Sequence, residues 1–168
     1  MCKRLLRVMR RRVFETNSSS THSLSIVGAS HMVSPSYGPR EIVVSPGEYG
    51  WGYERLYDPL SKLSYIVTAI QYYDQDIYTQ IRSDNEDAAA IDASRYFKWL
   101  SEMTEEYTGW TLTYKKSKKD WYPHGYIDHQ SVDLLDDYFI DNETEFKSNM
   151  RDIIFNDKYQ IIIDNDNH

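Results

Sequence analysis

Short polar side chains crowd into one early segment of the chain, residues 16–23. Hydroxyl and amide groups so close to the backbone, together with neighbouring backbone N–H groups, can cradle an anion such as a phosphate or a carboxylate. The sequence therefore predicts an anion site here, with an inert turn or a flexible serine linker as the alternative. The predicted ligand-binding residues of this segment and of the basic run before it are Arg12, Asn17, Ser18, Ser19, Ser20 and Thr21.

A second polar group lies in residues 121–131 and ends with Asp128, His129, Gln130 and Ser131. Imidazole and carboxylate groups can bind zinc, but their spacing matches no standard zinc motif and the chain has a single cysteine, so no metal is predicted. A hydrogen-bonded pair of Asp128 and His129 could instead orient a general base, with Gln130 and Ser131 lining the same site. The alternative is a polar turn in which Asp128 and Ser131 cap the next helix.

The two groups together also allow an enzyme. His22, Asp128 and His129 are the candidate catalytic residues, because imidazole groups titrate near neutral pH and a carboxylate can orient them. Neither a nucleophile elbow around a serine nor a phosphate loop nor a dinucleotide fingerprint is present. A hydrolase or transferase acting on a nucleotide-like substrate therefore stands as an alternative to simple binding.

Glycines alternate with aromatic residues between Tyr49 and Tyr53, and Trp51 is the largest of these side chains. Glycines let the backbone turn sharply while the rings project. One interpretation is a loop that covers the core. The other is a stacking platform for a planar ring such as a nucleobase, with Trp51 as the ligand-binding residue.

Charge is distributed unevenly along the chain. Its net charge is -7, yet the residues before Glu15 are basic. Acidic side chains usually solvate exposed helix faces, and an acidic body argues against nucleic acid as the partner. A further alternative is an acidic inhibitor that binds a host protein through the face carrying Asp133, Asp136 and Asp137.

Length and composition predict one domain over residues 10–168. Residues 1–9 are expected to be a disordered N-terminal extension, because translation could begin at Met9. No apolar run approaches the roughly 20 residues of a membrane span, so no membrane partner is expected. The single cysteine excludes an internal disulfide and fits the reducing cytoplasm.

Hydrophobic periodicity predicts an α+β fold, in which a small, mostly antiparallel sheet is covered on one face by two long and one or two shorter helices. The long helices are expected from Asp58 to Arg82 and from about Glu86 to Tyr107, the second favoured by its alanines and followed by Gly109 at its C-terminus. Two shorter helices are expected after Ser131 and after Asn142, the second with an apolar stripe of Phe146, Met150, Ile153 and Ile154. The expected strands are 12–15, which could form a hairpin with 23–27 through the serine segment, and 41–44, 110–114 and 159–163.

The segment from Arg11 to Ser23 resembles the opening of a family of uncharacterised phage and prophage proteins. The similarity continues at residues 46–51 and 125–131. The resemblance implies a protein of the host cytoplasm in an infected bacterium, with a role in counter-defence or host takeover. It implies no mechanism.

The leading hypothesis is that the serine segment, Trp51 and the turn at 128–131 converge on one pocket. Its ligand would be a phosphorylated small molecule or a nucleotide signal of host immunity, and the partner could also be a host defence protein. A homo-oligomer is allowed, and the residues identify no cofactor.

Overall fold

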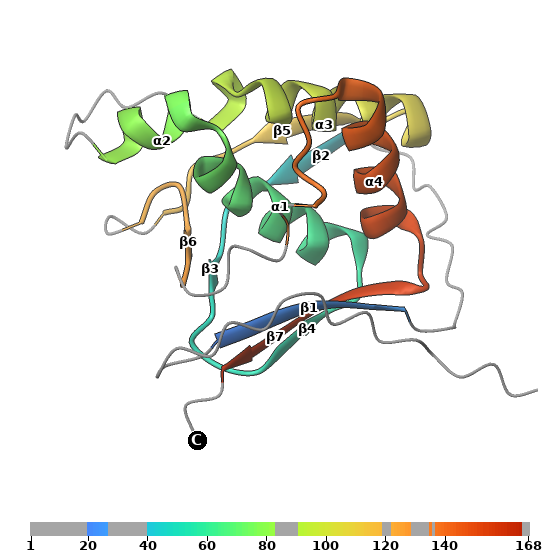
Figure 1. The fold of residues 1–168 in the computed structure, drawn as a ribbon. Coiled ribbons are helices and arrows are strands. Elements are labelled where there is room, and N and C mark those ends of the chain that lie inside the picture. Colours follow the sequence, from blue (N-terminus) through green and yellow to red (C-terminus); the bar gives the residue numbers. More distant parts are fainter. Residues whose placement is uncertain are drawn as a thin grey trace, which may run out of the picture.

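A computed structural model gives the fold, and it contains both helices and strands, as the sequence predicts (Figure 1). The backbone of residues 20–26, 80–82, 164 and 165 is described without the side chains. Residues 1–9, the strand expected at 12–15 and the start of the helix expected after Ser131 lie outside the described residues, whereas Leu135 and Phe139, expected on that helix, are described and buried. The structure describes residues 20–26, 40–82, 91–118, 122–128, 135 and 137–165.

The described strands form three small sheets. An antiparallel sheet has the order β1 (Ser20–Ile26), β7 (Tyr159–Asn165) and β4 (Glu54–Leu56). The strand β2 (Glu41–Val44) pairs in parallel with β5 (Thr111–Tyr114). The strand β3 (Glu48–Tyr49) pairs in parallel with β6 (Tyr126–Ile127).

The prediction of a mostly antiparallel sheet is therefore only partly supported. Two of the strand pairs are parallel, and parallel partners need a long crossover connection between them. The helices between β4 and β5 supply that connection. Sequence periodicity indicates which residues alternate along a strand but not which strand lies beside it.

Four α-helices and one short 3₁₀ helix are described. They are α1 (Pro59–Tyr73), α2 (Gln75–Arg82), the 3₁₀ helix η1 (Ile91–Ala93), α3 (Arg95–Thr108) and α4 (Glu143–Phe155). None within the described part of the chain is long and apolar enough to cross a membrane.

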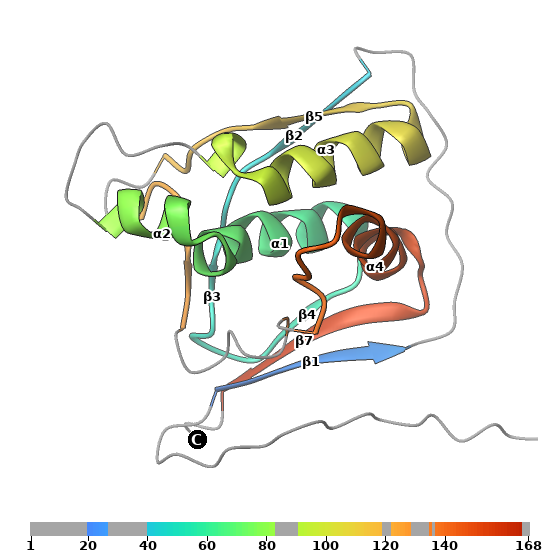
Figure 2. The ribbon, with the colours of Figure 1, turned by 45° about the horizontal axis from the view of Figure 1, so that its top comes forward.

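Helix α1 forms the middle of the molecule. It contacts β2, β6, α3 and α4. Figures 1 and 2 show the three-stranded sheet on one side of α1 and the β2–β5 pair with α3 on the other. Leu63, Ile66 and Ile70 are completely or almost completely buried, and each such side chain stabilises the fold by about 1.5–3 kcal/mol.

The prediction of a single long helix from Asp58 to Arg82 is wrong in one respect, because the helix breaks at Asp74. The start is confirmed: the Asp58 carboxylate accepts a hydrogen bond from the Ser61 N–H at 2.9 Å. Asp74 then leaves helical geometry, and its carboxylate accepts from the Ile77 N–H at 3.3 Å and from the Ser94 hydroxyl at 2.6 Å. The same buried residue thus ends α1 and caps α2.

Helix α3 begins later than the expected Glu86, at Arg95. Ser94 caps it by accepting from the Tyr96 N–H at 3.1 Å. Its end at Gly109 is as expected, with a left-handed φ of 73°. The alanine-rich residues that favoured an earlier start lie outside the described residues.

Helix α4 confirms both its predicted cap and its predicted apolar stripe. The Asn142 side chain accepts from the Glu145 N–H at 3.1 Å, and Phe146, Met150, Ile153 and Ile154 are all buried. Lys147 joins α4 to α3 through Glu102 at 2.8 Å. Helix α4 leads directly into β7, the central strand of the antiparallel sheet.

Candidate functional site

The paired strands β3 and β6 position the most unusual surface of the molecule. The Tyr126 N–H donates to the Gly47 carbonyl at 2.9 Å, and the Asp128 N–H donates to the Tyr49 carbonyl at 3.1 Å. Side chains alternate across this pair, so Tyr49 and Ile127 are buried while Tyr126 is only partly covered. The outer face of the pair therefore presents Tyr126.

Three aromatic rings meet on this outer face, and we call them the aromatic stack: Trp51, Tyr122 and Tyr126. The ring centroids of Trp51 and Tyr126 are 5.6 Å apart with planes inclined by 27°. Those of Tyr122 and Tyr126 are 5.0 Å apart with planes inclined by 35°. Trp51 is 66% exposed and Tyr122 is 40% exposed, so the two side chains that contact Tyr126 both face solvent.

Two glycines give the backbone the turns that present these rings. Gly50 has a φ of 98° and lies against Asp128, so close that a Cβ placed there would be 2.6 Å from the Asp128 Cβ. Gly125 has a φ of 77°, and a Cβ there would be 2.4 Å from the Gly47 carbonyl oxygen. Only glycine suits such positions without strain.

Helix α1 holds the Tyr122–Tyr126 turn from the inside. The Gln71 amide donates to the carbonyls of His124 at 3.2 Å and Gly125 at 3.1 Å. The Tyr72 hydroxyl is 3.0 Å from both the N–H and the carbonyl oxygen of Ile127. These bonds join the most buried helix to the turn, so the aromatic stack rests on a rigid support.

His124 is the buried centre of the same turn. Its Nδ1 lies 2.9 Å from the Tyr114 hydroxyl, and the two rings are stacked at a centroid separation of 6.3 Å. Burial lowers the pKa of His124, the charge of Lys116 lowers it further, and Asp92 opposes both. The charged form of His124 is therefore disfavoured, and its ring acts as a support for the turn.

Two of the residues that the sequence proposed for ligand binding or catalysis come together. Trp51 follows Gly50 in the chain, and Asp128 packs against Gly50, so the two residues are neighbours. Their proposed roles in binding and catalysis stay predictions.

The backbone positions of Ser20, Thr21 and His22 are described, in β1. Ser20 pairs with Asn165, His22 pairs with Ile163, and Ile163 pairs in turn with Glu54. The first residue of β1 and the turn between β3 and β4 are consequently at the same end of the antiparallel sheet, as both Figure 1 and Figure 2 show. Trp51 belongs to that turn.

The other proposed site residues lie outside the described residues. The predicted convergence of the serine segment, Trp51 and the turn at 128–131 on one pocket is therefore not tested as a whole. These residues are Arg12, Asn17, Ser18, Ser19, His129, Gln130 and Ser131.

Sequence reasoning missed Tyr122 and Tyr126 as partners of Trp51. The turn between them was noted for its polar groups, and the flanking tyrosines were not assigned a role. A Tyr-x-x-x-Tyr spacing around His124-Gly125 is a weak signal by itself, because fifteen tyrosines are spread over the chain. The pairing of β3 with β6 is what brings these rings to Trp51.

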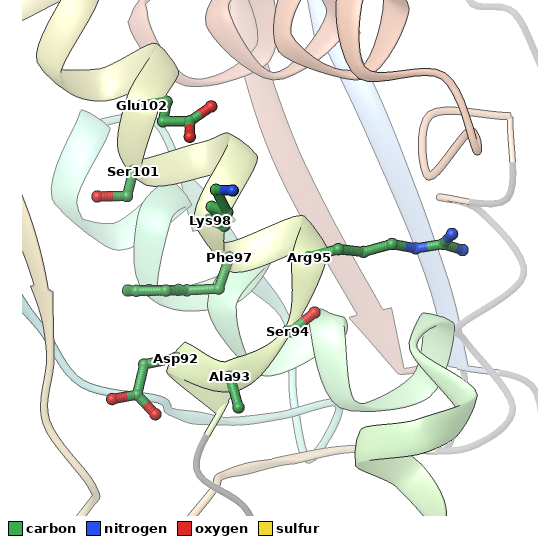
Figure 3. A pocket seen from close by; sticks show the side chains of 8 residues that line it. All are labelled: Asp92, Ala93, Ser94, Arg95, Phe97, Lys98, Ser101 and Glu102. Carbon is green, nitrogen blue, oxygen red and sulfur yellow. The ribbon is translucent and has the colours of Figure 1, made fainter.

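A separate hollow of about 480 Å³ lies beside the first turns of α3. Figure 3 shows Phe97 and Ser101 pointing to one side of the helix and Arg95 to the other. Two of its polar groups already have protein partners: Ser94 donates to Asp74, and Arg95 lies 2.7 Å from Asp141. The hollow is open and shallow, and it is a weaker candidate than the aromatic stack.

Within the described residues, no group of three or more His, Cys, Asp or Glu side chains could hold a metal ion. No protein-family model, curated protein or solved structure matches the chain. The resemblance to phage proteins stays a prediction, and the function is inferred from the geometry of the aromatic stack.

Proposed function

We propose that the protein binds a phosphorylated ligand that contains a nucleobase, and that the base stacks on Trp51. The observation that carries this proposal is that Trp51 is 66% exposed while it packs against Tyr126. A tryptophan held in place by one ring and open to solvent on the other side is prepared to receive a planar ring. Stacking of one base on such a side chain contributes about 1–3 kcal/mol.

Rigidity of the support strengthens the proposal. The turn that carries Tyr122 and Tyr126 is bonded to α1 through Gln71 and Tyr72. A ligand therefore meets rings that are already positioned, and binding costs less side-chain entropy than it would on mobile side chains. The stack offers ring faces for stacking, so binding is the activity that this surface supports best.

The predicted role of the serine segment in holding phosphate remains part of the proposal. It is supported by the position of Ser20, which starts β1 at the end of the sheet where Trp51 lies. In the phage setting implied by the sequence, such a protein would act by sequestering a nucleotide signal of host immunity.

The proposal is tested by titrating the protein with a panel of cyclic and ADP-ribose-type nucleotides, followed by calorimetry and by tryptophan fluorescence. We expect at least one nucleotide to bind and to change the emission of the exposed Trp51. Trp51→Ala should weaken that binding by roughly 1–3 kcal/mol, which is about 5-fold to 150-fold in Kd.

Tyr57→Ala is the matched control. Tyr57 is 72% exposed, comparable with Trp51, but it follows β4 and does not belong to the aromatic stack. Its removal should leave the affinity unchanged. The proposal is overturned if no nucleotide in the panel binds, or if Trp51→Ala and Tyr57→Ala bind equally well.

A further inference from the structure

The connection between β5 and β6 carries a group of exposed lysines: Lys115, Lys116 and Lys118. Within the described part of the chain, none of them forms an ion pair with a carboxylate. By contrast, Lys147 is bonded to Glu102 and Glu143, and Arg95 to Asp141. Three neighbouring lysines in a chain with a net charge of -7 form a local basic patch that attracts an anion.

The lysines lie next to the aromatic stack. The Ser117 N–H donates to the Pro123 carbonyl at 2.8 Å, which brings the lysine segment back against the residue that follows Tyr122. Lys116 and Lys118 flank Ser117. Both ammonium groups are therefore carried by backbone that is bonded beside the Tyr122 end of the stack.

The opposite end of the stack has the opposite charge. Asp128 packs against Gly50, next to Trp51. The lysines attract a phosphate. They thus favour a ligand with one phosphate at the Tyr122 end and a base at Trp51.

The rings extend further than one base can cover. Tyr126 separates two contacts of 5.6 Å and 5.0 Å, to Trp51 and to Tyr122. Because β3 and β6 are parallel, Trp51 follows their carboxyl ends while Tyr122 precedes their amino ends. A single base stacked on Trp51 leaves Tyr122 free for another one.

Building on the proposed function, we infer that the ligand contains at least two bases joined through phosphate. Lys116 and Lys118 hold the phosphate, and Trp51 and Tyr122 each receive a base. The shared chemistry is that of a linked dinucleotide or of a short single strand. Aromatic rings beside a basic groove are the usual means of binding such ligands without reading their sequence.

The test compares the wild type with a Lys116→Gln, Lys118→Gln double variant, using three probes: thymidine monophosphate, the dinucleotide thymidylyl-thymidine and a short oligothymidylate. Binding is measured by calorimetry over a series of salt concentrations. The dinucleotide should bind more tightly than the monophosphate. The plot of log K against log salt should lose a slope of roughly 0.7 for each phosphate contact that is removed from a single strand.

Lys158→Gln is the matched control, because Lys158 is also exposed but lies in the turn between α4 and β7. It should keep the affinity and the slope of the wild type. A dinucleotide that binds as tightly as the oligothymidylate identifies a small linked ligand, whereas tighter binding of the longer probe identifies a single strand. Either result supports the inference.

Three outcomes overturn the inference. In the first, the double variant keeps the salt dependence of the wild type. In the second, the monophosphate binds as tightly as the dinucleotide while Trp51 is still required, and the proposed function survives without the inference. In the third, neither these probes nor the nucleotide panel binds, and the proposed function fails with it.

Discussion

Gly125 is the residue on which the geometry of the aromatic stack depends most directly. Its φ of 77° is costly for any residue with a Cβ, and a Cβ would also be 2.4 Å from the Gly47 carbonyl oxygen. Backbone atoms cannot move aside as a flexible side chain can. Two separate penalties, backbone strain and overlap, therefore fall on one position.

Three glycine-to-alanine variants separate these penalties. Gly109→Ala adds strain alone, because its φ is 73° with nothing within 4 Å, and should cost about 1–2 kcal/mol. Gly125→Ala adds overlap as well and should cost about 3 kcal/mol or more. Gly52→Ala adds neither and should be neutral or slightly stabilising. Urea unfolding followed by circular dichroism measures all three.

The order of the three variants is the critical result. Equal losses for Gly125→Ala and Gly109→Ala would show that the approach to Gly47 is not limiting. A folded Gly125→Ala variant should also bind nucleotide more weakly, since the Tyr122–Tyr126 turn must move to admit the extra methyl group.

At the scale of single residues, the sequence was most informative for residues whose roles depend only on their neighbours in the chain. Asp58, Asn142 and Gly109 were assigned to helix ends, and the structure confirms each of them. Trp51 was proposed as a platform from its glycine neighbours alone. Tyr122 and Tyr126 could not be found in the same way, because their contact with Trp51 depends on strand pairing between distant segments.

Among the elements, the turn before β6 is tied to two others: to α1 through Gln71, and to β5 through Tyr114 and His124. His124 is buried in this turn, so its charged form is disfavoured in the folded protein. The charged groups that act on it are Lys116, which also disfavours the charged form, and Asp92, which favours it. Protonation of His124 therefore opposes folding.

The pH dependence of stability follows from this shift. The folded-state pKa of His124 lies below its unfolded value of about 6.5, so the unfolded chain binds the additional proton first. Stability should fall as pH is lowered from about 6.5 toward the folded pKa, and His124→Asn should lack this part of the decrease. Urea unfolding of both proteins over a pH series measures the difference.

Carboxylates also titrate at low pH, and the comparison with His124→Asn removes their contribution. An unchanged difference in the free energy of unfolding between the two proteins across this range would contradict the assignment. A pH-independent loss of about 1–2 kcal/mol, because Asn packs less well than His, adds to this pH-dependent difference without changing its slope.

The break between α1 and α2 shows that hydrophobic periodicity does not predict every helix boundary. The apolar spacing runs through Asp74 without interruption, and it predicted one helix. The competing signal was Asp74 itself, whose short carboxylate caps the following turn and also reaches Ser94. The bond to Ser94 comes from tertiary packing, and no local pattern indicates it.

At the scale of the whole molecule, α1 is enclosed by other elements on several sides. From Leu63 to Ile70 every residue except Ser64 is buried. Opening this helix exposes most of the core, so its amides cannot exchange through a local fluctuation.

Hydrogen exchange should therefore be slowest in α1. Its amides between Leu63 and Ile70 should exchange only through global unfolding, while those of α2 exchange faster because Gln75, Asp76 and Thr79 are exposed. Native-state exchange followed by NMR or mass spectrometry makes the comparison. Equal protection of the two helices would contradict the central position of α1.

The α+β class and most helices and strands were predictable because each depends on local pattern. The arrangement of the strands was not. Parallel pairing of β2 with β5 and of β3 with β6 satisfies the same alternation of Tyr49 and Ile127 as an antiparallel sheet would. The candidate site could not be predicted for the same reason, since it depends on the pairing of β3 with β6.

The order of strands in the antiparallel sheet has a consequence for synthesis of the protein. The central strand β7 is the last of the described elements along the chain, and both β1 and β4 pair with it. A ribosome releases β1 and β4 well before their common partner, so neither can acquire its final neighbour during most of translation. Until β7 has been synthesised, the edges of both strands lack their partner and must be kept from pairing with other chains.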